Sequence, residues 1–164
     1  MRTLNHNINP DFTCKNCGQI VSAQSLISGV VHRNHCPYCL HSRHVDLFEA
    51  GDRLCACKNL MAPVGLTTKK SRDKYTRYRS GELMLVHRCK GCGGLAINRI
   101  AADDDPYKIL HILQEHSMRN NLAEDCHQQG INLLTQEDIS LVNQRLFGQK
   151  NLTKEVLQYQ SCPL

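Results

Sequence analysis

The apolar residues fall into short runs in the first 100 residues and into longer, helix-spaced patterns after them. The early runs cover residues 19–21, 26–31, 83–86 and 95–100, and Gly, Cys and basic residues separate them. Runs of this length between turn-forming residues are typical of short strands and tight turns. We therefore expect a small domain of short antiparallel strands in this part of the chain.

The rest of the chain follows helical patterns. Pro106 stands at a first helical position behind a run of aspartates, and apolar residues follow with helical spacing, which predicts a helix over about 106–118. A second helix is predicted to begin after Thr135 and to stop at Gly148, and a weaker third to cover 154–160. The predicted architecture is α+β: a metal-binding domain over 1–102 and a helical C-terminal appendage over 103–164. We favour packing of this appendage on the first domain over a docking surface for a protein partner.

The composition indicates that something other than a large hydrophobic core stabilises the fold. Aromatic residues make up only 5% of the chain and tryptophan is absent, whereas there are ten cysteines. Residues 1–10 hold no apolar run of signal-peptide length, and no later stretch approaches the roughly 20 apolar residues of a membrane span. We therefore expect a cytoplasmic protein without membrane association, in which reduced cysteines bind metal instead of forming disulfides.

Charge is segregated along the chain. Residues 1–100 carry 15 Lys and Arg against 6 Asp and Glu, whereas residues 101–164 carry 5 against 9. Eight of the ten cysteines lie in the basic part. Metal and positive charge are therefore predicted to share one domain.

Two C-x-x-C pairs with 18 residues between them predict a first zinc site from Cys14, Cys17, Cys36 and Cys39. The other cysteines of the basic part predict a second zinc site from Cys55, Cys57, Cys89 and Cys92. Only one residue separates Cys55 from Cys57, so His44 or His87 is an alternative fourth ligand. The order of the pairs also permits interleaved sites, and we favour sequential pairing with two zinc ions.

Several segments resemble the RNHCP family. The sequence Arg33-Asn-His-Cys-Pro37, with a C-x-x-C pair upstream, matches the motif that names it. Further landmarks follow the same order over about residues 12–105: Phe12-Thr-Cys14, His44-Val-Asp46, Gly51-Asp-Arg53, Met61-Ala-Pro63, His87-Arg-Cys89 and Asn98-Arg99. The resemblance implies a zinc-ribbon-like domain, and it implies one cysteine after the Gly-Asp-Arg segment, at Cys57.

Two enzyme classes share parts of these motifs. Cys36-Pro-Tyr-Cys39 has the form of a glutaredoxin active site, but another C-x-x-C pair stands at metal spacing instead of the βαβ unit that redox chemistry needs. His32, Asn34 and His35 resemble a nuclease H-N-H set, but they crowd within four residues. We interpret the three as structural contacts and predict a protein without catalytic residues.

A basic segment, residues 69–79, holds six cations, one acid and two tyrosines in eleven residues. Such a segment suits a phosphate backbone with tyrosines available for base stacking, although a solvated loop is the alternative. The predicted contacts are Lys69, Lys70, Arg72, Lys74, Tyr75, Arg77, Tyr78 and Arg79. We expect binding to nucleic acid, and to RNA or the translation apparatus rather than DNA, because no recognition helix is visible. A protein adaptor that uses the helical tail ranks second, and a metal-dependent nuclease third.

Overall fold

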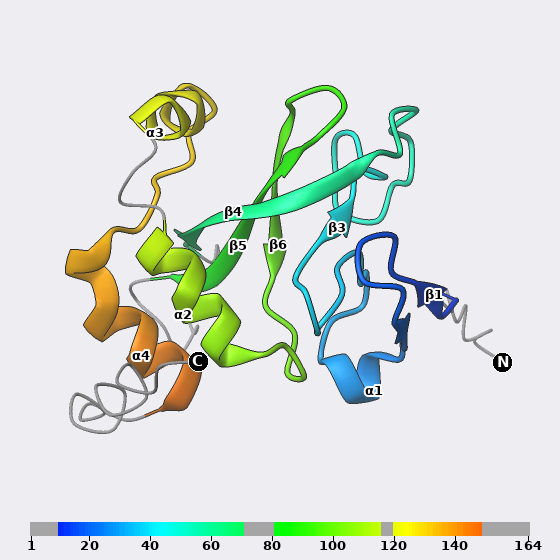
Figure 1. The fold of residues 1–164 in the computed structure, drawn as a ribbon, viewed down its shortest axis with the longest axis horizontal. Coiled ribbons are helices and arrows are strands. Elements are labelled where there is room, and N and C mark those ends of the chain that lie inside the picture. The colour runs from blue at the N-terminus through cyan, green and yellow to red at the C-terminus, as the bar shows by residue number, and fades with distance from the viewer. Residues whose placement is uncertain (1–9, 71–80, 116–119, 149–164) are drawn as a thin grey trace, which may run out of the picture.

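The protein combines a small sheet of antiparallel strands with C-terminal helices, as predicted. The computed structural model describes residues 10–70, 81–115 and 120–148 (Figure 1). Four strands form the main antiparallel sheet, in the order β3-β4-β5-β6. Their bounds are Ser42–Arg43 for β3, Leu60–Lys69 for β4, Glu82–Cys89 for β5 and Leu95–Arg99 for β6.

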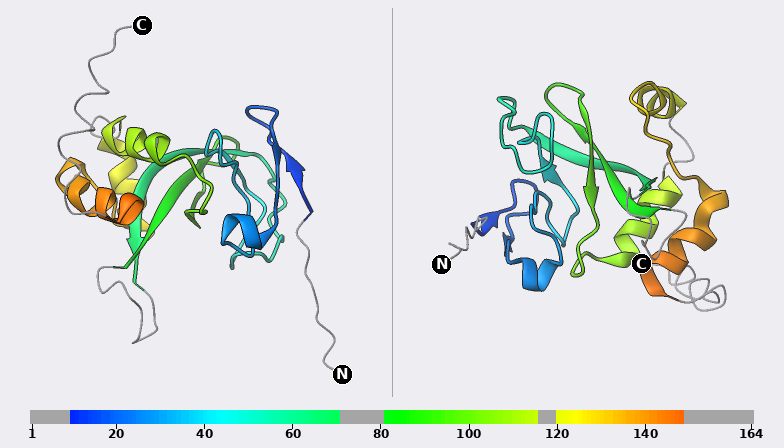
Figure 2. Two further views of the ribbon diagram at one scale, coloured as in Figure 1. Left: turned by 90° about the horizontal axis from the view of Figure 1, so that it is seen from below. Right: turned by 180° about the vertical axis from the view of Figure 1, so that it is seen from behind.

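An N-terminal lobe, residues 10–41, lies beside this sheet in each of the views (Figure 1 and Figure 2, blue). It contains a two-stranded ribbon of β1 (Phe12–Thr13) and β2 (Ile20–Val21), followed by the short helix α1 (Ser25–Ser28). The apolar run at 26–31, predicted as a strand, is thus helical at its start. Gly29 closes the turn with a left-handed φ of 69° and donates its amide to Ser25 at 2.8 Å.

Strand β4, ten residues long, was not predicted. It contains Pro63 and Gly65, which normally argue against a strand. The structure accommodates them in two ways. The register with β5 shifts between Pro63 and Gly65, and β3 pairs only with Leu60 and Met61, which leaves one side of β4 without a strand partner at Pro63 among the described residues. Proline is tolerated at such a position because it has no amide to donate.

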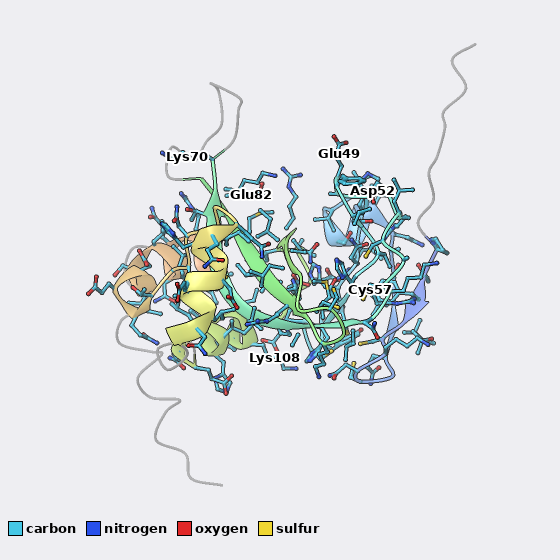
Figure 3. The ribbon with its side chains drawn as sticks, turned by 90° about the horizontal axis from the view of Figure 1, so that it is seen from above. Glu49, Asp52, Cys57, Lys70, Glu82 and Lys108 are labelled. Carbon is cyan, nitrogen blue, oxygen red and sulfur yellow. The ribbon has the colours of Figure 1, made fainter. Side chains whose placement is uncertain are left out.

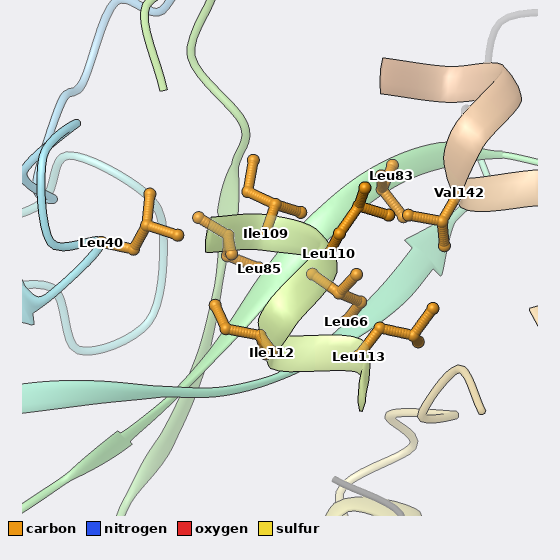
Figure 4. Close-up of a cluster of buried hydrophobic side chains, with 9 residues drawn as sticks. All are labelled: Leu40, Leu66, Leu83, Leu85, Ile109, Leu110, Ile112, Leu113 and Val142. Atoms are coloured by element: carbon orange, nitrogen blue, oxygen red, sulfur yellow. The ribbon is translucent and has the colours of Figure 1, made fainter. Parts of the chain in front are cut away.

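The main core lies between one face of the sheet and two helices, α2 (Pro106–Glu115) and α4 (Ile139–Phe147) (Figure 4). Both were predicted, and α4 follows the 3-10 turn η2 (Gln136–Asp138), where Thr135 and Asp138 form a capping box. The buried residues of this main core are Leu40, Leu66, Leu83, Leu85, Ile109, Leu110, Ile112, Leu113 and Val142. The helical tail therefore completes the hydrophobic core of the sheet.

Helix α3 (Asn120–Gln128) packs on the face of the sheet opposite to α2 and α4. Its Leu122 and Cys126 pack with Val64 and Val86, and Arg88 pairs with Asp125 at 2.9 Å. We did not predict this helix because its first turn is polar, although the spacing of Leu122 and Cys126 is a helical signal. The predicted third helix at 154–160 lies outside the described residues. No described helix has the length and apolar character that crossing a membrane requires.

Candidate metal centres

Four cysteines of the N-terminal lobe converge on one point. The sulfur atoms of Cys14, Cys17, Cys36 and Cys39 all lie within 4.8 Å of one another. The Sγ atoms of Cys14 and Cys39 are 3.5 Å apart, and those of Cys17 and Cys36 are 3.6 Å apart. Tetrahedral zinc with bonds of about 2.3 Å would separate its sulfur ligands by about 3.8 Å. This site, site 1, therefore has the geometry to hold one metal ion, from the two pairs that the sequence predicted.

The three C-x-x-C turns share one backbone pattern. The amide of the first cysteine donates to the carbonyl five residues on, at 2.8–2.9 Å, and the amide four residues on donates back to the carbonyl of the first cysteine, at 2.8–3.1 Å. That fourth residue takes a left-handed φ in each turn: 74° at Gly18, 58° at Leu40 and 76° at Gly93. Local hydrogen bonds therefore define the backbone conformation of each pair.

Leu40 departs from the glycine that this position favours. Its side chain is only 1% exposed and belongs to the main core. Its carbonyl accepts a hydrogen bond from Nε2 of His87 at 2.7 Å. Burial and this bond offset the cost of the left-handed backbone. They also connect the second C-x-x-C turn of site 1 to β5.

A second set, site 2, brings together His44, Cys57, Cys89 and Cys92, whose ligand atoms lie within 4.8 Å of one another. The Sγ atoms of Cys57 and Cys89 are 3.6 Å apart, and Sγ of Cys92 lies 3.2 Å from Nδ1 of His44. Cys89 ends β5, and Cys92 lies in the turn before β6. Three sulfurs and one imidazole nitrogen at these distances can hold one tetrahedral ion.

Cys55, predicted as the fourth ligand of site 2, lies outside the cluster, and His44 takes its place. The reason is the backbone pairing of two segments. His44 donates its amide to Asn59 at 2.9 Å and accepts from Lys58 at 3.0 Å, which sets it beside Cys57. The amide of Cys55 donates to the carbonyl of Val45, the residue after His44, at 2.9 Å, and Cys55 is buried.

His87, the other alternative ligand, belongs to the core. It donates through Nε2 to Leu40, and its Nδ1 accepts from the side-chain amide of Asn98 at 3.0 Å. Burial, and after it the nearby His35 ring, lowers the pKa of His87 to about 3. A neutral ring with both nitrogens engaged is not available to a metal ion.

Each of the two sites contains thiols with raised and with lowered pKa values. Burial raises the pKa of Cys36 far above its ordinary value. The side-chain amide of Asn59, 3.2 Å from Sγ of Cys57, lowers the pKa of the Cys57 thiol to about 6. Because metal ligation requires thiolates, a metal ion entering site 1 must displace protons from buried sulfur, and metal binding should weaken in acid.

The Arg-Asn-His part of the naming motif forms a buried polar network. Nη1 of Arg33 lies 2.8 Å from Asp103, and Nη2 lies 3.3 Å from Asp104. Nε2 of His35 is 2.7 Å from the other oxygen of Asp104, which also accepts the amide of Ala101 at 2.8 Å. The motif therefore fastens the N-terminal lobe to the segment that precedes α2.

Asn34 binds a second carboxylate, that of Asp46. It donates to Asp46 at 2.7 Å, and Asp46 also accepts the amides of Gly51 and Arg53, at 2.9 and 3.1 Å. The side chain of Arg53 donates to the Asn34 oxygen. His32 packs on Gly51, where a Cβ would lie 2.6 Å from the imidazole ring. These contacts give all three residues of the H-N-H set a structural role.

The predicted nucleic-acid contacts lie partly outside the described residues. Lys69 ends β4, Lys70 follows it, and both are exposed on the wall of a cavity of about 630 Å³. Outside the described residues lie Arg72, Lys74, Tyr75, Arg77, Tyr78 and Arg79.

Substitution distinguishes the two candidates for the fourth ligand of site 2. We expect His44→Ala to reduce the metal content of the purified protein from two ions to one, because it removes an imidazole nitrogen from the set. Cys55→Ala should retain both ions, since its sulfur lies outside the cluster. Elemental analysis measures the ratio. Loss of an ion from the Cys55 variant, with His44→Ala fully loaded, would contradict this assignment.

Comparisons with known proteins give one family assignment. No curated protein matches the chain, and no solved structure does. The model of the RNHCP domain matches residues 9–110, which include both metal centres and the buried network of the naming motif. The chain therefore belongs to the RNHCP domain family.

Proposed function

We propose that the protein is a zinc-stabilised nucleic-acid-binding protein that binds RNA or associates with the translation apparatus. The ligand sets support zinc, because four thiolates, or three thiolates and one imidazole, are sets that zinc favours in structural sites. The observation that carries nucleic-acid binding is the basic segment 69–79, with its six cations in eleven residues. It connects β4 to β5, and site 2 lies at the opposite end of this strand pair, where Met61 pairs with Cys89.

The described start of this segment supports the proposal. Lys69 and Lys70 are exposed, and among residues 10–70, 81–115 and 120–148 no carboxylate lies within ion-pair distance of either ammonium group. Their charge is therefore available to a phosphate. Arg99 lines the same cavity, where it pairs with Glu82 at 3.0 Å.

The helices support RNA or a single strand over a DNA major groove. A recognition helix needs an exposed basic face. The C-terminal part carries 5 basic residues against 9 acids, and the apolar faces of α2 and α4 are buried in the main core. The same burial gives less support to an adaptor that binds through the tail. The structural contacts of His32, Asn34 and His35 likewise give little support to a nuclease.

Salt dependence tests the proposal. If the segment makes about three to five phosphate contacts, log affinity for single-stranded RNA should fall with log salt at roughly −0.7 per contact. The triple variant Lys74→Gln, Arg77→Gln, Arg79→Gln should flatten that slope by about two units with metal content unchanged.

A matched control removes the same charge elsewhere. Lys15→Gln, Lys90→Gln, Lys108→Gln neutralises three exposed cations outside the segment and should leave the slope nearly unchanged. Fluorescence anisotropy of a labelled RNA measures both. If the segment variant keeps the affinity and slope of the natural protein, the segment is only solvated and the proposal fails.

A further inference from the structure

We propose that a groove between the 46–53 loop and β6 is the binding site for a single-stranded nucleic acid, with the ring of Phe48 stacking on a base. This inference rests on the proposed function and assigns it to described residues. The groove is built from two adjoining cavities of about 630 and 250 Å³. They share the lining residues Ala50, Lys69, Ile97 and Asn98, so the hollow is continuous along β6.

The two walls of the groove come from different parts of the fold. Figure 3 shows Glu49 and Asp52 of the loop on one side and Lys70 and Glu82 of the sheet on the other. Phe48 and Ala50 belong to the loop wall. Lys69, Lys70 and Arg99 belong to the sheet wall. Phe48 therefore lies on one wall of the groove, and Lys69 and Lys70 lie on the other wall together with Glu82.

The loop is held firmly by two carboxylates. Asp52 accepts the backbone amides of Leu47, Phe48, Glu49 and Leu54, at 2.8–3.0 Å. These bonds, led by that from Glu49, hold the pKa of Asp52 well below its usual range. Asp46 accepts two further amides, from Gly51 and Arg53. Six backbone donors are thus satisfied within eight residues, which is unusual for an exposed loop.

This fixed loop keeps Phe48 in solvent, with 82% of its surface exposed. The loop and the residue after it expose two further apolar residues, Leu47 and Leu54, which are 52% and 63% exposed. A group of exposed apolar side chains on a fixed loop indicates a binding surface. Pre-organisation also lowers the entropy lost on binding. Every nucleobase presents a π face to such a ring, whereas a duplex hides those faces in its own stack.

The charge on the sheet wall fits the backbone of the same strand. Lys69 and Lys70 are exposed, whereas Arg99 already pairs with Glu82 at 3.0 Å, so the two lysines supply the free positive charge of this wall. A base on Phe48 leaves its phosphates to be neutralised by these cations across the groove. An extended acidic peptide that pairs with the β6 edge would use the same charge but would not need an aromatic ring.

A single substitution turns Phe48 into a reporter. The chain contains no tryptophan, so Phe48→Trp places one indole at the site. Titration with a labelled oligouridylate of about 12 nucleotides should quench the indole fluorescence, at the same midpoint as the anisotropy of the label. Phe48→Leu keeps an apolar side chain without the ring, and should weaken binding about 5- to 150-fold.

The matched control is Leu26→Ala on α1, which removes an apolar side chain that is 97% exposed and should leave affinity unchanged. Salt-sensitive binding with no change in indole fluorescence and full affinity in Phe48→Leu would overturn this site and leave the proposed function standing. Competition by a polyglutamate peptide at similar affinity would instead assign the groove to acidic protein. Absence of any binding at low salt would overturn both proposals.

Discussion

Removal of both metal ions is expected to unfold the N-terminal lobe while the main sheet and its helices keep much of their structure. The apolar cluster of the lobe consists of Cys14, Val21 and Cys36 with Phe12 and Cys39 against it, so most of its members are ligands. Structural zinc contributes about 10–16 kcal/mol to the folding of small domains, far more than so small a cluster can. The main core contains nine buried residues, and site 1 and site 2 contribute none of them.

Hydrogen exchange read by mass spectrometry measures this expectation segment by segment. After chelation, residues 10–41 should lose amide protection, whereas β5 and α2 should retain it, and added zinc should restore the lobe. Full protection of the lobe in protein shown to be metal-free would contradict a structural role for the ion.

Two buried cysteines provide a matched pair for the same experiment. Cys36 and Cys126 are both fully buried, but only Cys36 belongs to a metal set. Cys36→Ser should cost one ion and the protection of the lobe. Cys126→Ser should keep both ions, because its side chain only packs between α3 and the sheet.

Asp104→Ala is expected to lower the free energy of unfolding by about 3–5 kcal/mol, because it leaves the buried guanidinium of Arg33 without its buried carboxylate partner. The side chains of Arg33 and Asp104 are both 0% exposed, and His35 loses its partner as well. The amide of Ala101 also loses its acceptor. A loss of this size is a large share of the stability of an ordinary domain.

Asp103 supplies the control for that substitution. It pairs with the same guanidinium at 2.8 Å, but its side chain is 31% exposed. Asp103→Ala should therefore cost only about 1 kcal/mol, since water can replace much of the lost interaction. Urea unfolding of both variants, with metal content measured alongside, gives the comparison. Equal losses would show that the burial of Asp104 does not set the strength of this network.

The sequence alone determined the local parts of this protein. Each C-x-x-C turn is closed by hydrogen bonds within six residues, so spacing and the glycines at 18 and 93 suffice to predict it. Helices α2 and α4 were found because Pro106, Thr135 and Gly148 mark their ends. The resemblance to the RNHCP family also rested on short segments, and the family model matches them.

Contacts between distant residues required the tertiary structure. His44 rather than Cys55 completes site 2 because pairing of 44–45 with 55–59 decides which side chain faces Cys57. Asp104, the partner of Arg33 and His35, lies about 70 positions away in sequence. Sequence spacing predicts that two ligands share a metal site only where few residues separate them. A longer connection can bring either of two nearby side chains to the same metal site. The tertiary fold therefore decided the fourth ligand, the role of the naming motif and the groove beside Phe48.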